Sequence, residues 1–308
     1  GSLYVADTRN HTIRLGWSLA HSGSADAWDE SDRSPATAAW PGDDASREAA
    51  QSDTLEATPT PTPTPTPLTE IFGVADDGTP LQWDVYVPTG DGPWPAVLAI
   101  HGGGFRSDQQ GPAMINAIED LRNAGYVVFN IQYRLAPPGI LSGQTSDGRY
   151  PDQPNDCKIV VRAARTDPRA NGKVGAVGGS AGGTHAGYLA ADGGDGQDKG
   201  DVAVCLSGAY DMSDPVSLTD PGFKAKMENY CFPGTPPPEP EYSATLLADS
   251  DVTKVKSNVS PMMLVQSDDE TMPLPQMPAM VAALNSAGAT NFVSILLPGT
   301  RHAWSNWP

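Results

Sequence analysis

Ser180 stands in the sequence Gly178-Gly-Ser-Ala-Gly182, where an apolar run gives way to a stretch of helical character. A serine on a tight strand-to-helix turn is held in a strained conformation that exposes its hydroxyl, and the glycines leave room for close backbone approach. A helix that begins at Ala181 turns its positive end toward that hydroxyl and favours negative charge there. The motif therefore predicts that Ser180 is a nucleophile.

A serine nucleophile needs a general base within hydrogen-bonding reach. The candidates are the histidines of the chain, His11, His21, His101, His185 and His302. The first two lie in a polar leader, and the third belongs to a glycine motif whose loop its ring is expected to brace. The fourth follows the serine on the same predicted helix, so it points away from the hydroxyl. His302, on the loop after the last predicted strand, remains as the predicted base.

The base in turn needs an acid that orients the imidazole and stabilises its cation. The loop after the predicted strand 261–267 offers Asp268, Asp269 and Glu270, and Asp211 is a more distant candidate after an earlier strand. All three loop residues fit the chain order of serine, acid and histidine. Spacing alone therefore leaves the acid open among them.

Three consecutive glycines, Gly102-Gly103-Gly104, follow a predicted apolar strand. Each glycine costs conformational entropy on folding, so such a run indicates a backbone that must approach another group closely. The amides of Gly103 and Gly104, together with that of Ala181, can donate to the oxyanion of a tetrahedral intermediate. The predicted chemistry is therefore acyl transfer by Ser180, which implies no metal and no organic cofactor.

From Leu68 onward, the pattern alternates strands with helices. The predicted strands cover 70–75, 81–88, 95–101, 126–133, 173–179, 202–208, 261–267 and 292–298. The predicted helices cover 111–124, 151–166, 181–191 and 275–287. The first two strands are expected to pair as a hairpin across the turn Asp76-Asp77-Gly78, and the others to feed crossover connections. This order is typical of a largely parallel sheet with helices on both faces.

The chain before Leu68 has a different character. Residues 1–17 contain a stretch that resembles the end of an NHL-type β-propeller repeat, as a remnant or by chance. Residues 18–67 are polar, lack periodicity and end in five Thr-Pro pairs, which predicts a disordered leader and an extended spacer. The domain that carries the chemistry is predicted to be 68–308, with 212–258 as an insertion beside the active site.

The composition excludes several kinds of partner. The chain has 37 acidic and 19 basic residues, for a formal net charge of −18 at pH 7. Such a charge repels nucleic acid and anionic lipid surfaces, and no apolar run reaches the length of a membrane span. We therefore expect neither nucleic acid nor membrane as a partner. No export signal follows Gly1, but the Thr-Pro spacer and the modular organisation favour an extracellular or periplasmic location.

The cysteines are Cys157, Cys205 and Cys231. No Cys-x-x-Cys pair and no metal-ligand spacing accompanies them, so we expect buried, inert thiols. A disulfide between Cys231 and either of the others remains open.

Five motifs occur in one order along the chain: His101–Gly104, Tyr133–Pro137, Tyr150–Gln153 with Asp156, Gly178–Gly183 and Pro298–His302. In this order they resemble the α/β-hydrolase esterases of the hormone-sensitive-lipase-like and feruloyl- and acetyl-xylan-esterase-like group. The resemblance runs from about Leu68 to the C-terminus. It implies the α/β-hydrolase fold, with a mostly parallel eight-stranded sheet and helices on both faces.

The resemblance also selects one acid. In those relatives the catalytic aspartate usually stands four residues before a proline, which here selects Asp269, with Pro273 following. The Gly-Gly-Ser-Ala-Gly form around Ser180 is closer to the feruloyl and acetyl-xylan esterases than to the lipases. Relatives usually continue past the histidine into a final helix, so we expect this domain to lack its last helix.

The function that the resemblance implies is that of a serine carboxylic-ester hydrolase. Its substrate would be a small-molecule or polysaccharide ester, with short acyl groups or the acetyl and feruloyl groups of plant polysaccharides. Two alternatives remain open. The same triad can serve an amidase or formamidase, and the fold can persist as a non-catalytic binding module. The oligomeric state is not predicted.

Overall fold

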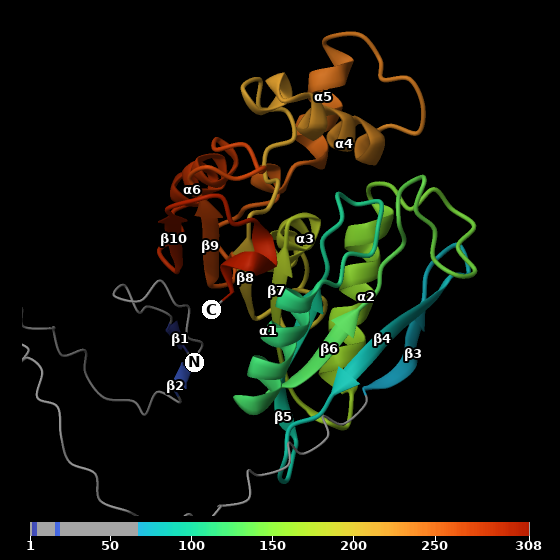
Figure 1. Ribbon diagram of the computed structural model, residues 1–308, viewed down its shortest axis with the longest axis vertical. Helices are drawn as coiled ribbons and strands as arrows, with labels where there is room; N and C mark the ends of the chain where they lie inside the picture. Colours follow the sequence, from blue (N-terminus) through green and yellow to red (C-terminus); the bar gives the residue numbers. More distant parts are fainter. Residues whose placement is uncertain (1, 5–15, 19–66, 308) are drawn as a thin grey trace, which may run out of the picture.

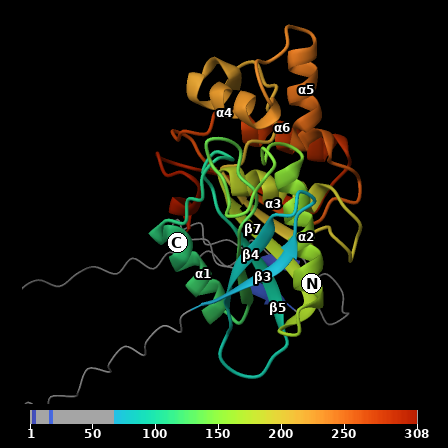
Figure 2. The same ribbon diagram turned by 90° about the vertical axis from the view of Figure 1, so that its right-hand side faces the viewer.

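An eight-stranded sheet organises the main part of the protein, in a computed structural model that describes residues 2–4, 16–18 and 67–307 (Figures 1 and 2). The strands are β3 (Leu68–Val74), β4 (Pro80–Tyr86), β5 (Trp94–Ile100), β6 (Val127–Ile131), β7 (Ala170–Gly179), β8 (Val202–Leu206), β9 (Met262–Ser267) and β10 (Phe292–Leu297). Each predicted strand is confirmed, with ends that differ by a few residues. The predicted mostly parallel eight-stranded sheet of the α/β-hydrolase fold is therefore confirmed.

The strands lie in the order β10-β9-β8-β7-β5-β6-β4-β3. The pairs from β10 through to β6 are parallel, whereas β4 pairs antiparallel with both β6 and β3. The β3–β4 hairpin closes through the turn that the sequence predicts, where the amide of Gly78 donates to the carbonyl of Ala75. The carboxyl ends of the parallel strands β5, β7, β8 and β9 thus share one edge of the sheet.

Helices cover both faces of the sheet, as predicted. The α-helices are α1 (Pro112–Asn123), α2 (Asp152–Thr166), α3 (Ala181–Ala191), α4 (Pro221–Cys231), α5 (Glu241–Asp249) and α6 (Gln276–Ser286). The short 3-10 helices are η1 (Ser217–Thr219), η2 (Asp251–Thr253) and η3 (Ala303–Asn306). The buried side chains of α2, α3 and α6 belong to one apolar core, and those of α1 and η3 to a second.

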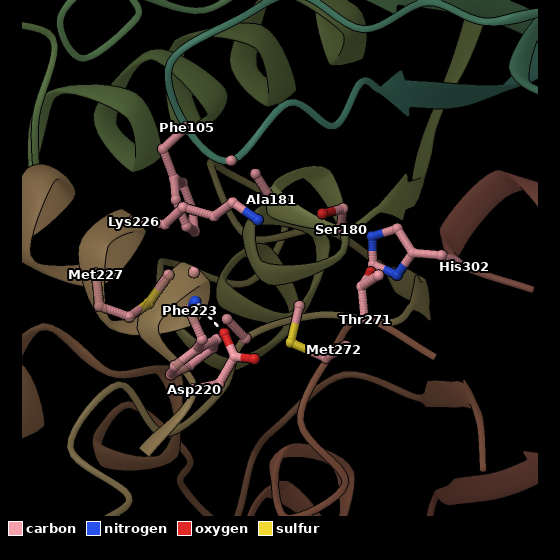
Figure 3. Close-up of a pocket in the computed structure, with 13 residues that line it drawn as sticks. Phe105, Ser180, Ala181, Asp220, Phe223, Lys226, Met227, Thr271, Met272 and His302 are labelled. Atoms are coloured by element: carbon pink, nitrogen blue, oxygen red, sulfur yellow. Dashed lines mark hydrogen bonds between the residues drawn. The ribbon is translucent and has the colours of Figure 1, made fainter. Parts of the chain in front are cut away.

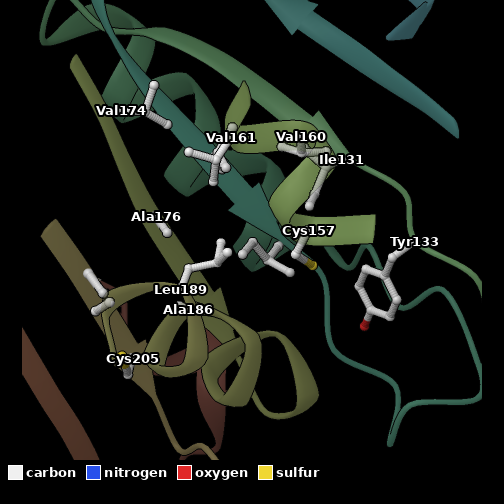
Figure 4. Packing of buried hydrophobic residues seen from close by; sticks show 14 of the residues in the cluster. Ile131, Tyr133, Cys157, Val160, Val161, Val174, Ala176, Ala186, Leu189 and Cys205 are labelled. Atoms are coloured by element: carbon white, nitrogen blue, oxygen red, sulfur yellow. The ribbon is translucent and has the colours of Figure 1, made fainter. Parts of the chain in front are cut away.

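Strand β5 shows why the two cores form on opposite faces. Side chains alternate between the faces of a sheet. Leu98 and Ile100 therefore point into the first core, whereas Val97 and Ala99 point into the second. Figure 4 shows side chains of α2 and α3 packed against strands in the first core. Because both faces are covered, the central strands are mostly apolar on both sides, which is typical of parallel sheets.

The segment 212–258 contains two helices that the sequence analysis did not predict, α4 and α5. The signals for α4 are present: Asp220 caps the helix by accepting from the amide of Phe223, and Pro221 occupies its first turn. Phe223 and Met227 are buried at helical spacing. The helical spacing of apolar residues is hard to recognise in the sequence, because these helices are short and a proline-rich connection separates them. The helices lie above the carboxyl edge of the sheet, beside the strand ends (Figures 1 and 2).

Strands β1 (Ser2–Tyr4) and β2 (Gly16–Ser18) pair antiparallel. The predicted propeller remnant over 1–17 and the predicted disordered leader over 18–67 fall mostly outside the described residues and stay predictions. Among the residues that the structure describes, no helix combines the length and the apolar character needed to cross a membrane.

Candidate active site

Ser180 lies on the turn between β7 and α3, as the sequence predicts. Its φ of 58° and ψ of −122° place a non-glycine residue in a left-handed region. Such a conformation costs about 1–3 kcal/mol and persists only where the surroundings impose it. Here the amide of Ser180 donates to the carbonyl of Leu206 at 2.8 Å, which ties the turn to β8.

The glycines around the serine are required by sterics. A Cβ at Gly178 would lie 1.9 Å from the carbonyl oxygen of Gly182, and a Cβ at Gly182 would lie 2.1 Å from that of Ile100. These separations are far below van der Waals contact with backbone atoms that cannot move aside. The turn is therefore compact because β5, β7 and α3 approach one another without side chains between them.

His302 lies next to the serine, as predicted. Both residues line the same two pockets, and Figure 3 shows the imidazole beside Ser180. The Nδ1 atom of His302 is hydrogen-bonded to Oε2 of Glu270. This bond fixes the tautomer, because a carboxylate accepts the proton on Nδ1 and leaves Nε2 as the acceptor on the side of the serine.

The structure contradicts the selection of Asp269 as the acid. The carboxylate on His302 is that of Glu270, whose side chain is 0% exposed. Asp269 is exposed, and its contact is a backbone bond from its amide to the carbonyl of Gly299. Asp268 is also exposed and accepts from the amide of Gly299. In this tight loop consecutive side chains diverge, so a one-residue step decides which carboxylate turns inward.

Glu270 is held by a network that the sequence analysis did not foresee. Its Oε1 accepts from the hydroxyl of Ser207 at 2.8 Å and from the amide of Ser267 at 2.8 Å. The hydroxyl of Ser207 in turn accepts from the amide of Ala303, next to the histidine. A buried carboxylate with these donors stays in position beside the imidazole. Asp211, the more distant candidate for the acid, accepts instead from the amide and the hydroxyl of Ser213 in its own turn.

The predicted oxyanion residues lie on the loop after β5 and at the start of α3. Gly103 and Gly104 have φ values of 121° and 58°, and a Cβ at Gly103 would lie 1.8 Å from the carbonyl oxygen of Ser107. Gly104 and Ala181 line a pocket together with Ser180. Gly103 lies next to that lining without belonging to it. The glycine loop is therefore close to the serine. Of the predicted oxyanion donors, Gly104 on this loop and Ala181 on α3 border the same pocket as Ser180.

His101 braces this loop from beneath, as expected. Its ring is fully buried, stacks on Tyr133 and is hydrogen-bonded through Nδ1 to the carbonyl of Gly102 at 2.8 Å. The hydroxyl of Tyr133 donates to the carbonyl of His101. Burial lowers the pKa of His101, so the ring stays neutral. These contacts hold the glycine run against the serine turn.

His185 packs away from the serine, also as expected. It is hydrogen-bonded through Nε2 to Oε1 of Gln153 at 3.0 Å. The amide nitrogen of Gln153 donates to the carbonyls of Phe105 and Gly148, so its oxygen must be the acceptor and His185 the donor. Burial lowers the pKa of His185 to about 3. This chain of bonds connects α3 and α2 to the residue after the glycine run.

We predict that His185 makes the protein sensitive to acid. Its pKa is lower in the folded chain than in the unfolded chain, where histidine titrates near about 6.5. The stability that it contributes is therefore fully present above that pH and falls as the pH drops toward about 3. Replacing it by glutamine, which keeps a donor and does not titrate, removes this dependence.

The measurement is the free energy of unfolding by urea for the wild type and His185→Gln between pH 8 and pH 4. The free energy of unfolding of the wild type, relative to that of the variant, should decrease by on the order of 3 kcal/mol from pH 7 to pH 4. One titrating group changes this free energy by at most about 1.4 kcal/mol per pH unit. A difference that stays constant over this range would show that His185 already titrates freely in the folded chain.

Arg134, from the second predicted motif, is an anchor beside the site. Its side chain is 1% exposed and donates through Nε and Nη2 to both oxygens of the Asp156 carboxylate, which is fully buried on α2. Further contacts reach Asp76 and Ser146. The amide of Ala136, two residues after Arg134, donates to the carbonyl of Phe105. The motif thus supports the glycine loop through this contact with Phe105, and none of its residues lines either pocket.

Two pockets meet at Ser180 and His302. The first, here called the insertion pocket, has a volume of about 250 Å³ and is lined by Gly104, Phe105, Ser180, Ala181, Ala209, Asp220, Gly222, Phe223, Lys226, Met227, Thr271, Met272 and His302 (Figure 3). Five of these residues come from the segment 212–258. The segment 212–258 therefore lies beside Ser180 and His302, as the sequence predicts.

The second, here called the tryptophan pocket, is a more open hollow of about 600 Å³. Its lining includes Gln109, Gln110, Met114, Trp304 and Ser305 beside Ser180 and His302. Trp304 thus lines the pocket on the side of the serine away from the segment 212–258. The serine therefore lies between two pockets that differ in volume and in lining. Such an arrangement suits a substrate that carries a different chemical group on each side of the bond to be cleaved.

The cysteines take no part in the site. Cys157, Cys205 and Cys231 are free and buried. Burial raises the pKa of each thiol, so all three remain protonated. The prediction of buried, inert thiols is confirmed, and no disulfide joins Cys231 to either of the others.

Comparison with known proteins places this chain among esterases. The sequence model of the BD-FAE family (bifunctional feruloyl/acetyl xylan esterase) matches residues 83–284, well over half of the chain. That range includes the serine turn, the glycine loop and Glu270, and ends before His302. A search of the curated proteins gave no match.

Solved structures with this fold include three esterases. An acetyl ester-xyloside bifunctional hydrolase from Caldicellulosiruptor lactoaceticus has a TM-score of 0.61 and 17% identity, covering 78% of this chain and 89% of its own. A truncated carbohydrate esterase from gut microbiota has a TM-score of 0.60 and 17% identity, covering 78% and 91%. A propionate-bound esterase, Est2 of Thermogutta terrifontis, has a TM-score of 0.58 and 19% identity, covering 79% and 86%. At these identities the likeness supports the fold.

Proposed function

Because the chain belongs to the BD-FAE family of esterases, we propose that it is a serine carboxylic-ester hydrolase that acts on short-acyl esters and on acetyl or feruloyl esters of plant polysaccharides. The observation that carries this proposal is the position of Ser180. It stands on a strained turn between two pockets and beside a histidine whose far nitrogen is bound to a buried carboxylate.

In the first step Ser180 attacks the ester carbonyl. Its hydroxyl turns toward Nε2 of His302 and gives up its proton as the new bond forms. The imidazolium that results is stabilised by Glu270, which keeps its negative charge and holds the Nδ1 proton. The oxyanion accepts from the amides of Gly104 and Ala181, with that of Gly103 next to them. Each such donor is worth about 3 kcal/mol of barrier.

Collapse of the tetrahedral intermediate breaks the ester bond. His302 returns its proton to the leaving alcohol, and an acyl group remains on Ser180. Water then enters, loses a proton to Nε2 and attacks the acyl-enzyme through a second intermediate with the same oxyanion contacts. The carboxylic acid leaves and the serine regains its proton. The two half-reactions use the same groups in reverse order, so no further residue is required.

The two pockets support an ester with unlike sides. The insertion pocket combines apolar walls from Phe105, Phe223 and Met272 with a small volume, which suits one group of limited size. The tryptophan pocket is open, and its two glutamines suit the hydroxyls of a sugar. Support for a carbohydrate ester also comes from the family and from the names of the similar hydrolases.

The test is covalent labelling of the full chain with paraoxon, followed by peptide mapping. A nucleophilic serine hydrolase takes up one diethylphosphoryl group on the peptide that contains Ser180, and release of acetate from acetylated xylan stops in proportion to the label. An esterase of Thermogutta terrifontis with the same fold has been crystallised in its paraoxon-phosphorylated form. Full acetate release from a chain labelled at Ser180, or a label on another residue, would overturn the proposal.

A further inference from the structure

Lys226 is the cation of the insertion pocket. It lies on α4 and is half-buried, and its stem packs over the glycine loop, because a Cβ at Gly104 would lie 3.1 Å from Cδ of Lys226. Figure 3 shows its ammonium group pointing across the pocket toward Ser180 and Ala181. A positive charge is therefore placed within the pocket that the serine borders.

This ammonium group has no protein counter-ion among residues 67–307. Lys224, two residues earlier and therefore on a different side of α4, pairs with Glu228 instead. The other charged residue of the pocket is Asp220, and one of its oxygens already accepts from the amide of Phe223 as the helix cap. In a chain with a formal net charge of −18, this lysine therefore keeps its ammonium group available to an anion that enters the pocket.

The charge is confined to one side of the serine. The lining of the tryptophan pocket contains glutamines, glycines, apolar residues and Ser305, with no lysine, arginine, aspartate or glutamate. A general attraction for anions would place cations around both pockets. A single lysine in the smaller pocket instead selects one group at one position on the ester.

We propose that Lys226 determines specificity by binding a carboxylate carried by the ester substrate. This inference rests on the proposed function. A lysine ammonium offers three donors to a carboxylate, and such charge-assisted hydrogen bonds are about twice as strong as neutral ones. The carboxylate belongs either to the acyl group, as in a half-ester of a dicarboxylic acid, or to the alcohol, as in an acetylated hydroxy acid.

Two pairs of esters distinguish these sources, and within each pair a carboxylate replaces a neutral isopropyl group of similar size. Ethyl hydrogen succinate and ethyl 4-methylpentanoate place the difference on the acyl side, with ethanol release as the assay. For the alcohol side, 3-acetoxypropanoate and 3-methylbutyl acetate serve, with acetate release. In each pair the readout is kcat/KM for the anionic ester divided by kcat/KM for the neutral one, at pH 7 and low ionic strength.

Lys226→Met is expected to lower this ratio by about 10- to 100-fold in one of the two pairs, which identifies the side that carries the carboxylate. Lys226→Arg keeps the positive charge and should retain most of the ratio. Lys224→Met is the matched control, because it removes a lysine from the same helix outside the pocket. The control should leave both ratios as in the wild type. Added salt should lower the wild-type ratio in the affected pair.

A ratio that Lys226→Met leaves unchanged in both pairs would overturn the inference. An equal loss on the anionic and the neutral ester would do the same, since it would assign Lys226 to the fold of the pocket or to the oxyanion. If the wild type hydrolyses none of the four esters, nor acetylated xylan, the proposed function fails first and the inference with it. The two failures are thus distinguishable.

Discussion

Ser180→Ala is expected to lower kcat for short-acyl esters by about 10⁵- to 10⁶-fold while leaving the fold intact. The hydroxyl is the proposed nucleophile, and its removal leaves only what the pocket and the oxyanion donors contribute. Alanine adopts the same strained backbone and creates no void, so the melting temperature should change little. The measurement is the initial rate of 4-nitrophenyl acetate hydrolysis by the full chain, beside its thermal unfolding curve.

Ser286→Ala is the matched control for this variant. Ser286 ends α6, is exposed, and its hydroxyl bonds to the carbonyl of Ala282 within its own helix. This control should retain wild-type activity. If Ser180→Ala folds normally and keeps more than about a hundredth of the wild-type kcat, the acyl-enzyme mechanism is wrong, because the remaining groups cannot supply that rate.

Glu270→Gln is expected to lower kcat by about 10³- to 10⁴-fold. The glutamine side chain is almost the same size, but it carries no charge and no longer stabilises an imidazolium at His302. It also presents a donor where the histidine needs an acceptor, which favours the wrong tautomer. KM should change less than kcat, because Glu270 lies behind the histidine and lines neither pocket.

Asp269→Asn and Asp268→Asn are the controls for this prediction, since both residues neighbour Glu270 in sequence and are exposed. Each should keep activity within a few fold of the wild type. The comparison decides between the geometry of the structure and the spacing rule of the resembling esterases. A large loss in Asp269→Asn together with near-normal Glu270→Gln would restore the aspartate as the acid.

These two predictions depend on the sequence to different degrees. Ser180 and His302 follow from local signals: a Gly-x-Ser-x-Gly turn at a strand-to-helix joint, and the one histidine on a loop after the last strand. The strands themselves are equally local, because a strand buried on both faces must be apolar along its whole length. The serine turn, the histidine loop and the strands can therefore each be recognised from a few neighbouring residues.

The identity of the acid is not written locally. Asp268, Asp269 and Glu270 share a loop, and each can carry the negative charge that the histidine needs. Glu270 turns inward because Ser207, on another strand, and the amide of Ser267 meet it there. The choice therefore depends on residues that are close only after β8, β9 and the last loop have assembled.

Helices α4 and α5 also depend on both local sequence signals and tertiary contacts. The sequence contains a cap for α4 and an apolar residue that each helix buries, but short helices between proline-rich connections gain most of their stability from the surface on which they pack. Tertiary structure also brings Lys226 to the serine pocket, although it stands 46 positions after Ser180 in the chain.

The fold class, the serine turn, the position of His302 after the last strand and the glycine loop all follow from the sequence, because each depends on backbone geometry and burial that neighbouring residues impose. The carboxylate that meets His302, the insertion helices and the charge in the pocket follow only from the tertiary structure. These depend on the directions of side chains from distant segments, and a direction in space has no signature in the spacing of residues along a chain.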